Sequence, residues 1–564
     1  MAVCCSCGIS FQITEKDAAF YRDIGPVVQG KRRGVPPPTH CFECRLQRKL
    51  AFRNERKLYR RKCSLSGKEI ISNFSPVAPC PVYSNDIWYS EQWDPLAFGK
   101  DYQETRSFFE QFKELFYATP QPSRVTFAEN ENSDYCNYNL GFKDSYLCFW
   151  GDYNQESLYC YQCVRIKNCV ECFGAYECEQ CYRLVKASNC SNSHSIVNSY
   201  GITDSAFLFQ CSDCHHCFQC TNLRHRSYCI DNLQYTKAEY EERISKYYLH
   251  RATVLDEQSA IFELRRNLVP VPAVRISNCE DCTGHDIGNS KSCTHCFCFY
   301  QGNESCAYCV ASGDSLYKVY DCYGSVYDIK SSYEILSATF GCQDVAFSLN
   351  IKSSHDVYYS VNCAHCNNIF GCVGLTRKNY CIFNKQYSQE NYNKVLERII
   401  LAMERNSEWG EFFPIAHSLF SYEETPAQDC FPLSPKNATS RGVRWIAYEP
   451  PQPEVTQSVE AASLPDSIHD IANEITDSTI RCIQSGRAFR SPKMELAFYR
   501  THGLPLPRLH PELRIERLMR NRKAFKLWQI NCERCGVVTN SVYEPESALH
   551  VWCEKCYNNE ALAQ

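Results

Sequence analysis

The two ends of the chain are copies of one module, and this duplication limits the possible folds more than any other feature. Residues 7–23, CGISFQITEKDAAFYRD, match residues 485–501, SGRAFRSPKMELAFYRT, without a gap. After a nine-residue insertion in the first copy, residues 36–63 align with residues 505–532, so Arg45, Arg48 and Cys63 correspond to Arg514, Arg517 and Cys532. A match of this length is not expected by chance, so one folding unit is present twice.

Each module has positions for two metal sites, and the copies keep different ones. The complete set of the first copy is Cys4, Cys7, Cys41 and Cys44, which aligns with Cys482, Ser485, His510 and Leu513. The complete set of the second copy is Cys532, Cys535, Cys553 and Cys556. Two residues between paired cysteines let a tight turn direct both sulfurs at one ion, and four thiolates leave no position for water. We therefore predict two structural zinc ions, with iron–sulfur ligation as the main alternative.

The second site of the first copy is degenerate. Cys63 and Ser66 stand where Cys532 and Cys535 lie in the other copy. A looser match of WYSEQWD to VWCEKCY places Ser90 and Trp93 at the other two positions. These residues cannot complete a tetrahedron of thiolates, so packing must replace the metal there.

The chain of 564 residues contains 40 cysteines, so their redox state decides much of its chemistry. The start, MAVCCSCGISFQITEKD, lacks the features of a secretory signal, and no run approaches the ~18 apolar residues that span a bilayer. We therefore expect a cytoplasmic protein with reduced, metal-binding thiols and no membrane; an extracellular disulfide scaffold is the alternative. The net charge of −4 excludes a polycation, so binding of nucleic acid would need local basic patches.

Each module carries a basic segment beside its metal-binding positions. CRLQRKLAFRNERKLYRRKC, residues 44–63, has leucines at helical spacing, and RIERLMRNRKAFK, residues 514–526, repeats the design. A basic helix next to a zinc site can present charge to phosphates, so we predict contact with nucleic acid or a ribonucleoprotein; the alternative is a solvated face. The candidate contacts are Arg45, Arg48, Lys49, Arg53, Arg56, Lys57, Arg514, Arg517, Arg522 and Lys526.

The middle of the chain is repetitive and is itself duplicated. Residues 204–240 align without a gap with residues 356–392, and openings such as DSYL, DSAFLF, DVAF and DVYY recur. Cysteines fall nine apart at 160, 169 and 178 and again at 211, 220 and 229. Frequent short strands with polar turns indicate stacked coils, as in a β-solenoid or parallel β-helix, with the cysteines packed in the core.

A chain of compact zinc knuckles is the alternative for this region. The further candidate metal ligands are then Cys160, Cys163, Cys169, Cys172, Cys178, Cys181, Cys211, Cys214, Cys279, Cys282, Cys293, Cys296, Cys306, Cys309, Cys363 and Cys366. Their pairing into sites does not follow from the sequence. The number of metal ions per chain would separate the two alternatives, because the packed core adds none to the two terminal sites.

The expected fold class is mixed and β-rich, with zinc-ribbon or zinc-knuckle modules at both ends of a repetitive, cysteine-rich, β-solenoid-like middle with inserted helices. The expected division is residues 1–100, N-terminal zinc module; 101–133, helical connector; 134–235, first repeat half; 236–270, helix; 271–387, second repeat half; 388–412, helix; 413–480, linker with a short amphipathic helix near 466–480; and 481–564, C-terminal zinc module. Thr236 opens the first of these helices with a capping box.

Several motifs, taken together, resemble an uncharacterised family of long, cysteine-rich zinc-ribbon proteins from ultra-small bacteria of the candidate phyla radiation. They are YCIFNKQYSQENY, SYEETPAQDCFPL, GVRW, SLPDSI, ELAFYRTHGLPLPR, CERC and CEKCY, and they extend over most of the chain. The resemblance implies zinc ribbons at both ends and no particular activity. The chain departs from the family pattern at Ser485, His510 and Leu513.

No motif favours catalysis. The sequence has no phosphate loop and no dinucleotide fingerprint, and SDCHHCFQC, residues 212–220, has no specific acid, base or open metal position beside it. We therefore expect no enzyme and no small-molecule substrate. The first hypothesis is a zinc protein that binds nucleic acid or a ribonucleoprotein through its basic helices. The second is a protein-interaction scaffold that uses the solenoid surface, and the third is thiol redox chemistry or zinc storage.

Overall fold

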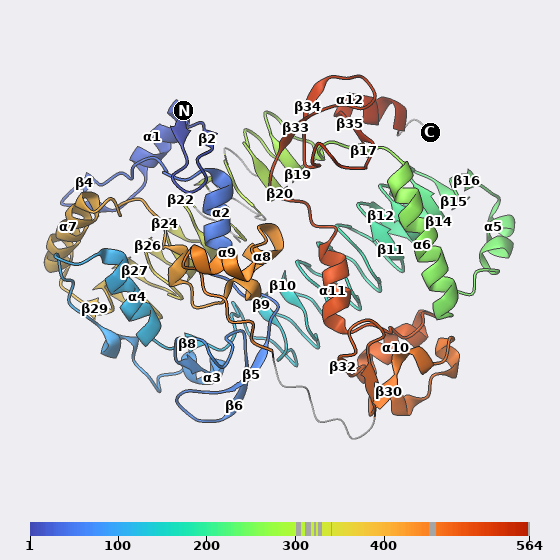
Figure 1. Cartoon of the computed structure of the whole chain (residues 1–564), viewed down its shortest axis with the longest axis horizontal. Helices are drawn as coiled ribbons and strands as arrows, with labels where there is room; N and C mark the ends of the chain where they lie inside the picture. The colour runs from blue at the N-terminus through green and yellow to red at the C-terminus, as the bar shows by residue number, and fades with distance from the viewer. Residues whose placement is uncertain are drawn as a thin grey trace. The chain divides into compact units, whose positions relative to one another are not determined.

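The computed structural model describes residues 1–299, 306–310, 317–320, 323–324, 330–339, 341–449 and 458–561 (Figure 1). The chain divides into two compact units. Unit 1 comprises residues 1–124, 274–448 and 524–527, and unit 2 comprises residues 125–273, 449–523 and 528–564. The N-terminal module therefore shares a unit with the second half of the middle region, and most of the C-terminal module shares one with the first half.

Unit 2 contains the first coil stack, residues 126–234, in which each turn of the chain pairs in parallel with the next. Lys143 pairs with Gln155, Gln155 with Lys167, and Lys167 with Glu179, so the same spacing separates successive turns. The longer paired segments are β9 (Asn137–Leu140), β10 (Phe149–Asp152), β11 (His194–Val197), β12 (Tyr200–Thr203), β13 (Ala206–Phe209), β14 (Ser212–Thr221) and β15 (Ser227–Ile230). An antiparallel strand, β16 (Leu233–Gln234), ends the stack.

The local period of the stack is three residues. From Cys160 to Cys190 every third residue, whether Cys, Ile, Ala or Leu, is buried in one continuous core. The residue before each inward position has left-handed backbone, for example Tyr159 at φ 57°, Gln162 at φ 57° and Arg165 at φ 53°. Non-glycine residues rarely adopt this conformation, so the parallel pairing between turns and the packing of the core must stabilise it. Paired positions are twelve residues apart, so each turn of the stack has four sides of three residues. These short sides enclose a narrow interior, which accommodates only small inward side chains.

Unit 1 contains the second coil stack, residues 276–386, with the same parallel pairing but less regular turns. Ile276 pairs with Ile287, Lys330 with Gln343 and Gln343 with His355, so the spacing between paired positions varies from one turn to another. Its strands are β18 (Ile276–Ser277), β19 (Gly284–Gly288), β20 (Cys296–Phe299), β21 (Tyr317–Tyr320), β22 (Lys330–Tyr333), β23 (Leu336–Thr339), β24 (Gln343–Ala346), β25 (Leu349–Lys352), β26 (His355–Tyr358), β27 (Asn367–Phe370), β28 (Asn379–Ile382) and the antiparallel β29 (Lys385–Gln386).

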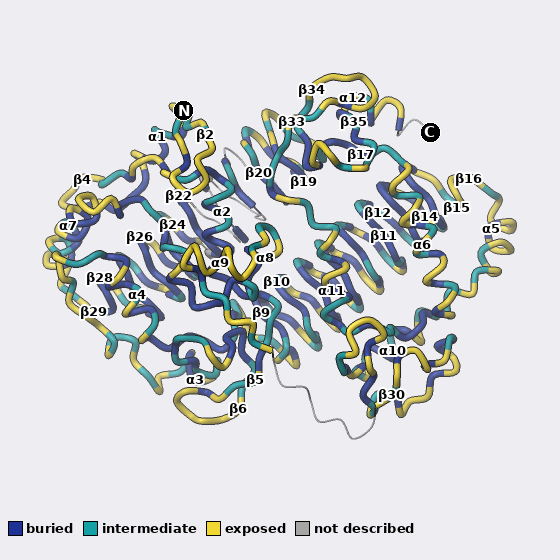
Figure 2. Tube along the Cα trace, in the orientation of Figure 1, coloured by how far each residue is buried: buried dark blue, intermediate teal, exposed yellow. Residues whose placement is uncertain are grey.

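Each stack runs into a capped helix, as the sequence predicts. In unit 2, α5 (Lys237–Ile244) starts at Thr236, whose side chain and that of Glu239 form a capping box. A break separates α5 from α6 (Ala252–Leu268), so the helix predicted over 236–270 is two helices. In unit 1, α7 (Gln389–Arg405) buries one face, including Leu396 and Ile400, against its own unit. Figure 2 shows α5 as mostly exposed.

The two terminal modules have the same elements in the same order. The first has α1 (Glu15–Asp23), α2 (Phe42–Leu50), β5 (Tyr59–Lys62), β6 (Glu69–Ser72) and β7 (Val82–Tyr83). The second has α10 (Lys493–Thr501), α11 (Pro511–Met519), β33 (Trp528–Asn531), β34 (Val538–Ser541) and β35 (Val551–Trp552). The leucine spacing predicts one basic helix over residues 44–63, but α2 ends at Leu50 and Arg60–Lys62 lie on strand β5.

Each module joins the body of its unit through one short parallel pairing. β7 pairs with β8 (Gln121–Pro122), and β35 pairs with β17 (Val271–Pro272). The other helices of unit 1 are α3 (Asn85–Trp88), α4 (Phe108–Ala118), α8 (Pro426–Cys430) and α9 (Pro435–Ser440). Phe412, Phe413, Leu419 and Tyr422 are buried, so the beginning of the predicted linker is packed into unit 1.

The short amphipathic helix predicted near residues 466–480 is absent from the described part of that segment. Two 3₁₀ turns lie there instead, Ile468–Asp470 and Asn473–Thr476, followed by β31 (Thr479–Arg481). Each turn still buries an isoleucine, Ile468 and Ile475, so the apolar residues that suggested a helix serve packing. No helix in the described ranges is long and apolar enough to cross a membrane.

Candidate metal centres

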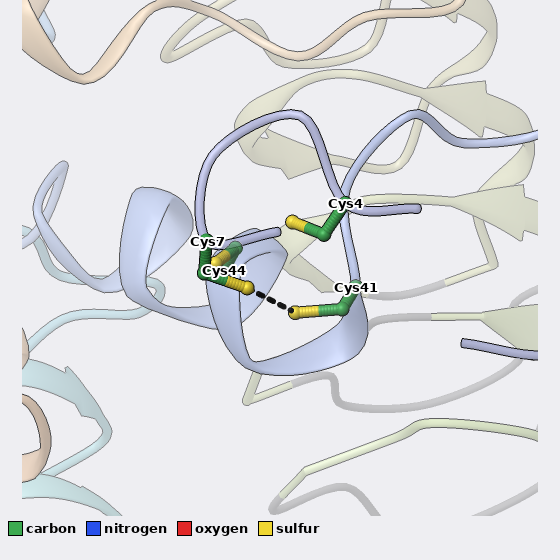
Figure 3. Close-up of side chains that lie close together, drawn as sticks. All are labelled: Cys4, Cys7, Cys41 and Cys44. Atoms are coloured by element: carbon green, nitrogen blue, oxygen red, sulfur yellow. Dashed lines mark hydrogen bonds between the residues drawn. The ribbon is translucent and has the colours of Figure 1, made fainter. Parts of the chain in front are cut away.

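The N-terminal module brings Cys4, Cys7, Cys41 and Cys44 together (Figure 3). Their four sulfurs all lie within 4.8 Å of one another, and the Sγ atoms of Cys7 and Cys41 are 3.7 Å apart. Two sulfurs bound tetrahedrally at about 2.3 Å from one ion are separated by about 3.8 Å, so the spacing fits a zinc-sized ion. The first pair comes from the turn before β2 (Ser10–Phe11) and the second from the start of α2.

The C-terminal module forms the same arrangement from Cys532, Cys535, Cys553 and Cys556. Here the Sγ atoms of Cys535 and Cys553 are 3.8 Å apart. The first pair lies between β33 and β34, and the second follows β35. Among the described residues, these two quartets are the places where three or more potential metal ligands come together.

A glycine with left-handed backbone closes the first turn of each site. The amide of Gly8 donates to the carbonyl oxygen of Cys4 at 2.9 Å, and the amide of Gly536 donates to that of Cys532 at 2.8 Å. The φ angles of these two glycines are 73° and 75°. Residues with a β-carbon adopt such angles at a cost, so glycine after the Cys-x2-Cys pair is the local reason that the turn forms.

Backbone amides prepare the first cysteine of each quartet to act as a thiolate. Burial raises the pKa of Cys4, but hydrogen bonds from the backbone of Cys41, Cys7 and Ser6 more than offset it and lower the pKa to about 6. Burial also raises the pKa of Cys532, and backbone hydrogen bonds from Cys553, Cys535 and Arg534 lower it to about 6. Metal binding needs thiolates, so both sites hold one ligand that is already largely deprotonated at neutral pH.

The degenerate site of the C-terminal module keeps the turn without the metal. The Sγ atom of Cys482 accepts a hydrogen bond from the amide of Ser485 at 3.4 Å, and Gly486 closes the turn as Gly8 does. His510 caps α11 by accepting from the amide of Glu512 through Nδ1. The residues that replaced the ligands therefore satisfy local hydrogen bonds.

The degenerate site of the N-terminal module lies at different residues from those that the sequence match indicates. The amide of Ser84 donates to Cys63 Sγ at 3.4 Å, as the amide of Cys553 donates to Cys532 Sγ at 3.1 Å. Ser84 follows β7 as Cys553 follows β35, so Ser84 and Ile87 are the counterparts of Cys553 and Cys556. The match to Ser90 and Trp93 was wrong because it followed a local Trp-x-Ser similarity and ignored strand pairing.

The central cysteines line the interior of the two coil stacks. Except for Cys279 and Cys282, which are half-buried, the central candidates are buried, and no disulfide joins the cysteines in the described ranges. Cys160 Sγ, for example, donates to the carbonyl oxygens of Leu158 at 3.2 Å and of Cys169 at 3.6 Å. Burial raises the pKa of Cys169 and of Cys363 well above the usual value, so these two thiols are satisfied as neutral donors. The pKa of Cys178 is lowered instead, chiefly by a hydrogen bond with the thiol of Cys190.

The basic segment of the N-terminal module is turned inward. Arg45, Arg48, Lys49 and Arg53 are all buried. Arg48 lies 2.8 Å from Glu334 of the second coil stack and 3.0 Å from Glu411. Arg53 forms an ion pair with Glu55 and donates to Ser337. These cations therefore hold the module on its stack.

The basic segment of the C-terminal module repeats this attachment in unit 2. Arg514, 1% exposed, lies 2.8 Å from both Glu171 of the first coil stack and Glu495 of α10. Its guanidinium carbon stands 4.3 Å from the centre of the Tyr159 ring. Burial lowers the pKa of Arg514, but the carboxylates of Glu495 and Glu171 raise it well above its ordinary value. The remaining candidates are less buried: Arg517 is exposed, and Arg56, Lys57, Arg522 and Lys526 are half-buried.

Each attachment also contains a stack tyrosine whose hydroxyl binds a carboxylate of the module, which the alignment of the modules does not reveal. Asp17 and Glu495 occupy the same position of the duplicated module. The hydroxyl of Tyr320 donates to Asp17 at 2.9 Å, and the hydroxyl of Tyr159 donates to Glu495 at 2.8 Å. Each tyrosine belongs to the coil stack of the unit that holds its module, so both modules are attached to a stack by a buried carboxylate that accepts from a tyrosine hydroxyl.

Comparisons with protein-family models, with curated proteins and with solved structures found no match to this chain. The geometry of its own residues therefore carries the functional argument.

Proposed function

We propose that this chain is a non-enzymatic scaffold in which two structural zinc ions hold terminal modules on two β-solenoid bodies, whose outer surfaces bind a protein partner. The observation that carries the proposal is the pair of four-cysteine clusters, each within 4.8 Å, one at the start of α2 and the other beside β35, the strand that pairs with β17. A closed set of four thiolates supports stapling, because it leaves no open position for a reacting water. The many cysteines outside disulfides in the described ranges support a reducing compartment such as the cytoplasm.

The inward orientation of the basic segments favours a protein partner over nucleic acid. Five of the predicted phosphate contacts are buried, four of them in unit 1 and Arg514 in unit 2. A guanidinium that already meets two carboxylates has no free donor face for a phosphate, and exposing it would leave those carboxylates unpaired. Contact with nucleic acid would then depend on Arg56, Lys57, Arg517, Arg522 and Lys526.

Several exposed cations of the coil stacks are matched by anions one turn away. Lys143 lies 2.9 Å from Glu131, Arg165 lies 3.5 Å from Glu177, and Lys291 lies 2.8 Å from Glu280. Such mixed charge gives no extended positive field for a polyanion. A surface of this kind suits a protein partner that matches the ladder of alternating charges.

Binding of a labelled single-stranded RNA of mixed sequence, followed by fluorescence anisotropy, tests the choice of partner. Because counterion release makes nucleic-acid binding strongest at low salt, the titration is made at low and at physiological ionic strength. We expect no saturable binding at either. Saturable, salt-sensitive binding that is lost in Arg517→Gln and Lys526→Gln variants would favour the nucleic-acid hypothesis, with Arg60→Gln as the control at an exposed arginine outside the candidate set.

The likeness to the zinc-ribbon family of ultra-small bacteria stays a proposal that rests on the motifs quoted above. It agrees with the scaffold proposal in one respect, since both require zinc at the two ends of the chain. A measurement of zinc per chain therefore tests what the two share.

A further inference from the structure

A cavity of about 270 Å³ in unit 2 is lined by four arginines. It lies between the first coil stack, α6, the segment at 505–509 and α11. The cationic lining residues are Arg183, Arg508, Arg514 and Arg517, and one carboxylate, that of the exposed Asp256, also lines it. Neither the zinc sites nor the proposed scaffold surface uses this cavity.

Several of the guanidinium donors around the cavity have no partner. Arg514 meets Glu171 and Glu495 through Nη1, while its buried Nε and Nη2 donate to no group in the described ranges. Arg508 donates through Nη2 to the carbonyl oxygens of Leu464 and Pro465, and its buried Nε is unpartnered among the same residues. Unsatisfied buried donors are costly, so these groups can take a further acceptor.

Arg517 adds a cation without a counter-charge. Its recorded contact is a hydrogen bond of 3.3 Å to the side-chain oxygen of Gln484. In the part of the chain that the structure describes, no carboxylate lies within ion-pair distance of Arg517 or Arg508, although Asp466 interacts with Arg508 electrostatically. The stack residue beside them on the cavity wall, Arg183, is itself an arginine, paired at 3.2 Å with Glu171.

The duplicated module shows what fills the same place in unit 1. Arg508 and Arg517 align with Thr39 and Arg48. The backbone confirms this register, because the amide of Cys5 donates to the carbonyl oxygen of Thr39 at 3.1 Å and the amide of Ile483 donates to that of Arg508 at 3.2 Å. The two positions are therefore equivalent in space as well as in sequence.

In unit 1 both positions bind one carboxylate, that of Glu411. Thr39 donates its hydroxyl to one carboxylate oxygen of Glu411, and Arg48 Nη1 donates to the other at 3.0 Å. Glu411 comes from the segment after α7, far away in the sequence, and Arg48 also meets Glu334 of the stack. Unit 1 thus supplies two acids to this place, whereas unit 2 has Arg508 in place of the threonine and an open cavity.

We propose that the arginine-lined cavity of unit 2 binds a carboxylate group supplied from outside the chain, held by Arg508 and Arg517 where Glu411 is held in the other copy. Guanidinium groups match carboxylate geometry with two parallel hydrogen bonds, and the partly enclosed wall strengthens such pairs. The cavity is large enough for the carboxylate and a few attached atoms. The carboxylate comes either from a free small acid or from an acidic side chain of a peptide.

Calorimetric titration of the zinc-loaded full-length protein tests the proposal with three probes: glutarate, an end-blocked Gly-Glu-Gly peptide and inorganic phosphate. We expect one carboxylate site per chain. Its Kd should rise about ten-fold or more in Arg508→Gln and Arg517→Gln variants, since each loses a charge-assisted hydrogen bond. Arg520→Gln is the matched control, because Arg520 lies at the end of the same helix, is exposed and is not part of the cavity wall.

The probes separate the sources of the carboxylate. Peptide binding about ten-fold tighter than glutarate assigns the site to an acidic side chain, and equal or weaker peptide binding assigns it to a free acid. Absence of binding by both carboxylates, binding of phosphate alone, or binding unchanged in the two arginine variants would overturn the proposal. Zinc content and far-ultraviolet circular dichroism show that each variant is folded, so a negative result leaves the zinc-stapled scaffold standing.

Discussion

Removal of one complete cysteine pair should remove one zinc ion and loosen one module. The double variant Cys532→Ser/Cys535→Ser takes two of four thiolates from the C-terminal quartet, whose sulfurs all lie within 4.8 Å. Structural zinc in sites of this kind contributes about 10–16 kcal/mol of apparent binding free energy at pH 7, which corresponds to a Kd of about 50 nM or lower. Zinc at intact sites should therefore survive gel filtration, and two ligands cannot hold it.

The expected metal contents are two zinc ions per chain for the natural protein and one for the double variant, measured by plasma mass spectrometry against protein concentration. The matched controls are Cys63→Ser and Cys482→Ser, because each alters the single cysteine of a degenerate site and should leave two ions bound. Limited proteolysis gives a second readout. Without the C-terminal zinc, the pairing of Val551 with Val271 has less support, so cleavage within residues 528–561 should become faster.

Three results would refute the reasoning. Five or more zinc ions per chain would mean that central cysteines bind metal as an array of knuckles. Two ions retained by the double variant would mean that the C-terminal quartet is not a zinc site. Iron with broad visible absorption near 400 nm would replace zinc by a cluster of iron and sulfide.

Three further changes test the packing around these sites. Arg514→Met should lower the free energy of unfolding of unit 2 by about 3–5 kcal/mol, because Glu171 and Glu495 would stay buried without a counter-charge, and adding Glu495→Gln should recover part of the loss in urea titrations. Burial raises the pKa of Glu411, but bonds from His40, Arg48 and Thr39 lower it to about 2, so its stabilising effect is full above about pH 4.5 and disappears as the pH falls towards 2. The stability difference between the natural protein and Glu411→Gln should accordingly shrink from about 3 kcal/mol at pH 7 to near zero at pH 2, and a difference independent of pH would contradict this. Gly284→Ala should destabilise unit 1, because a β-carbon would lie 1.8 Å from the carbonyl oxygen of Cys296 at a φ of 140°; Gly341→Ala, where φ is also positive but no atom lies within 4 Å, is the control for backbone strain alone.

The sequence predicts the parts of this protein that depend on local spacing. Cys-x2-Cys followed by glycine defines each zinc turn, and the Thr236 box defines the start of α5, because those contacts join residues a few positions apart. The nine-residue cysteine spacing is three steps of the three-residue inward period, because Cys160, Cys169 and Cys178 all line the same core. The length of a full turn of the stack is harder to predict from the sequence. A three-residue period makes spacings of nine, twelve and fifteen residues equally regular.

The contacts that decide the orientation of the basic segments join distant residues and leave no pattern in the sequence. Arg48 meets Glu334, and Arg514 meets Glu171. Each pair is separated by hundreds of residues, and a glutamate on a polar turn of a repeat looks like any solvated acid. The charge density of residues 44–63 was therefore visible, whereas its neutralisation by the stack was not.

The order of the two units along the chain connects each terminal module to a segment that is distant in sequence. The N-terminal module packs on the second stack, and most of the C-terminal module packs in the unit of the first. In each unit a buried carboxylate of the module accepts from a tyrosine hydroxyl of the stack, Asp17 from Tyr320 and Glu495 from Tyr159. A zinc ion at each end would stabilise a contact between the beginning or end of the chain and its middle, so loss of one ion should loosen one unit and leave the other folded.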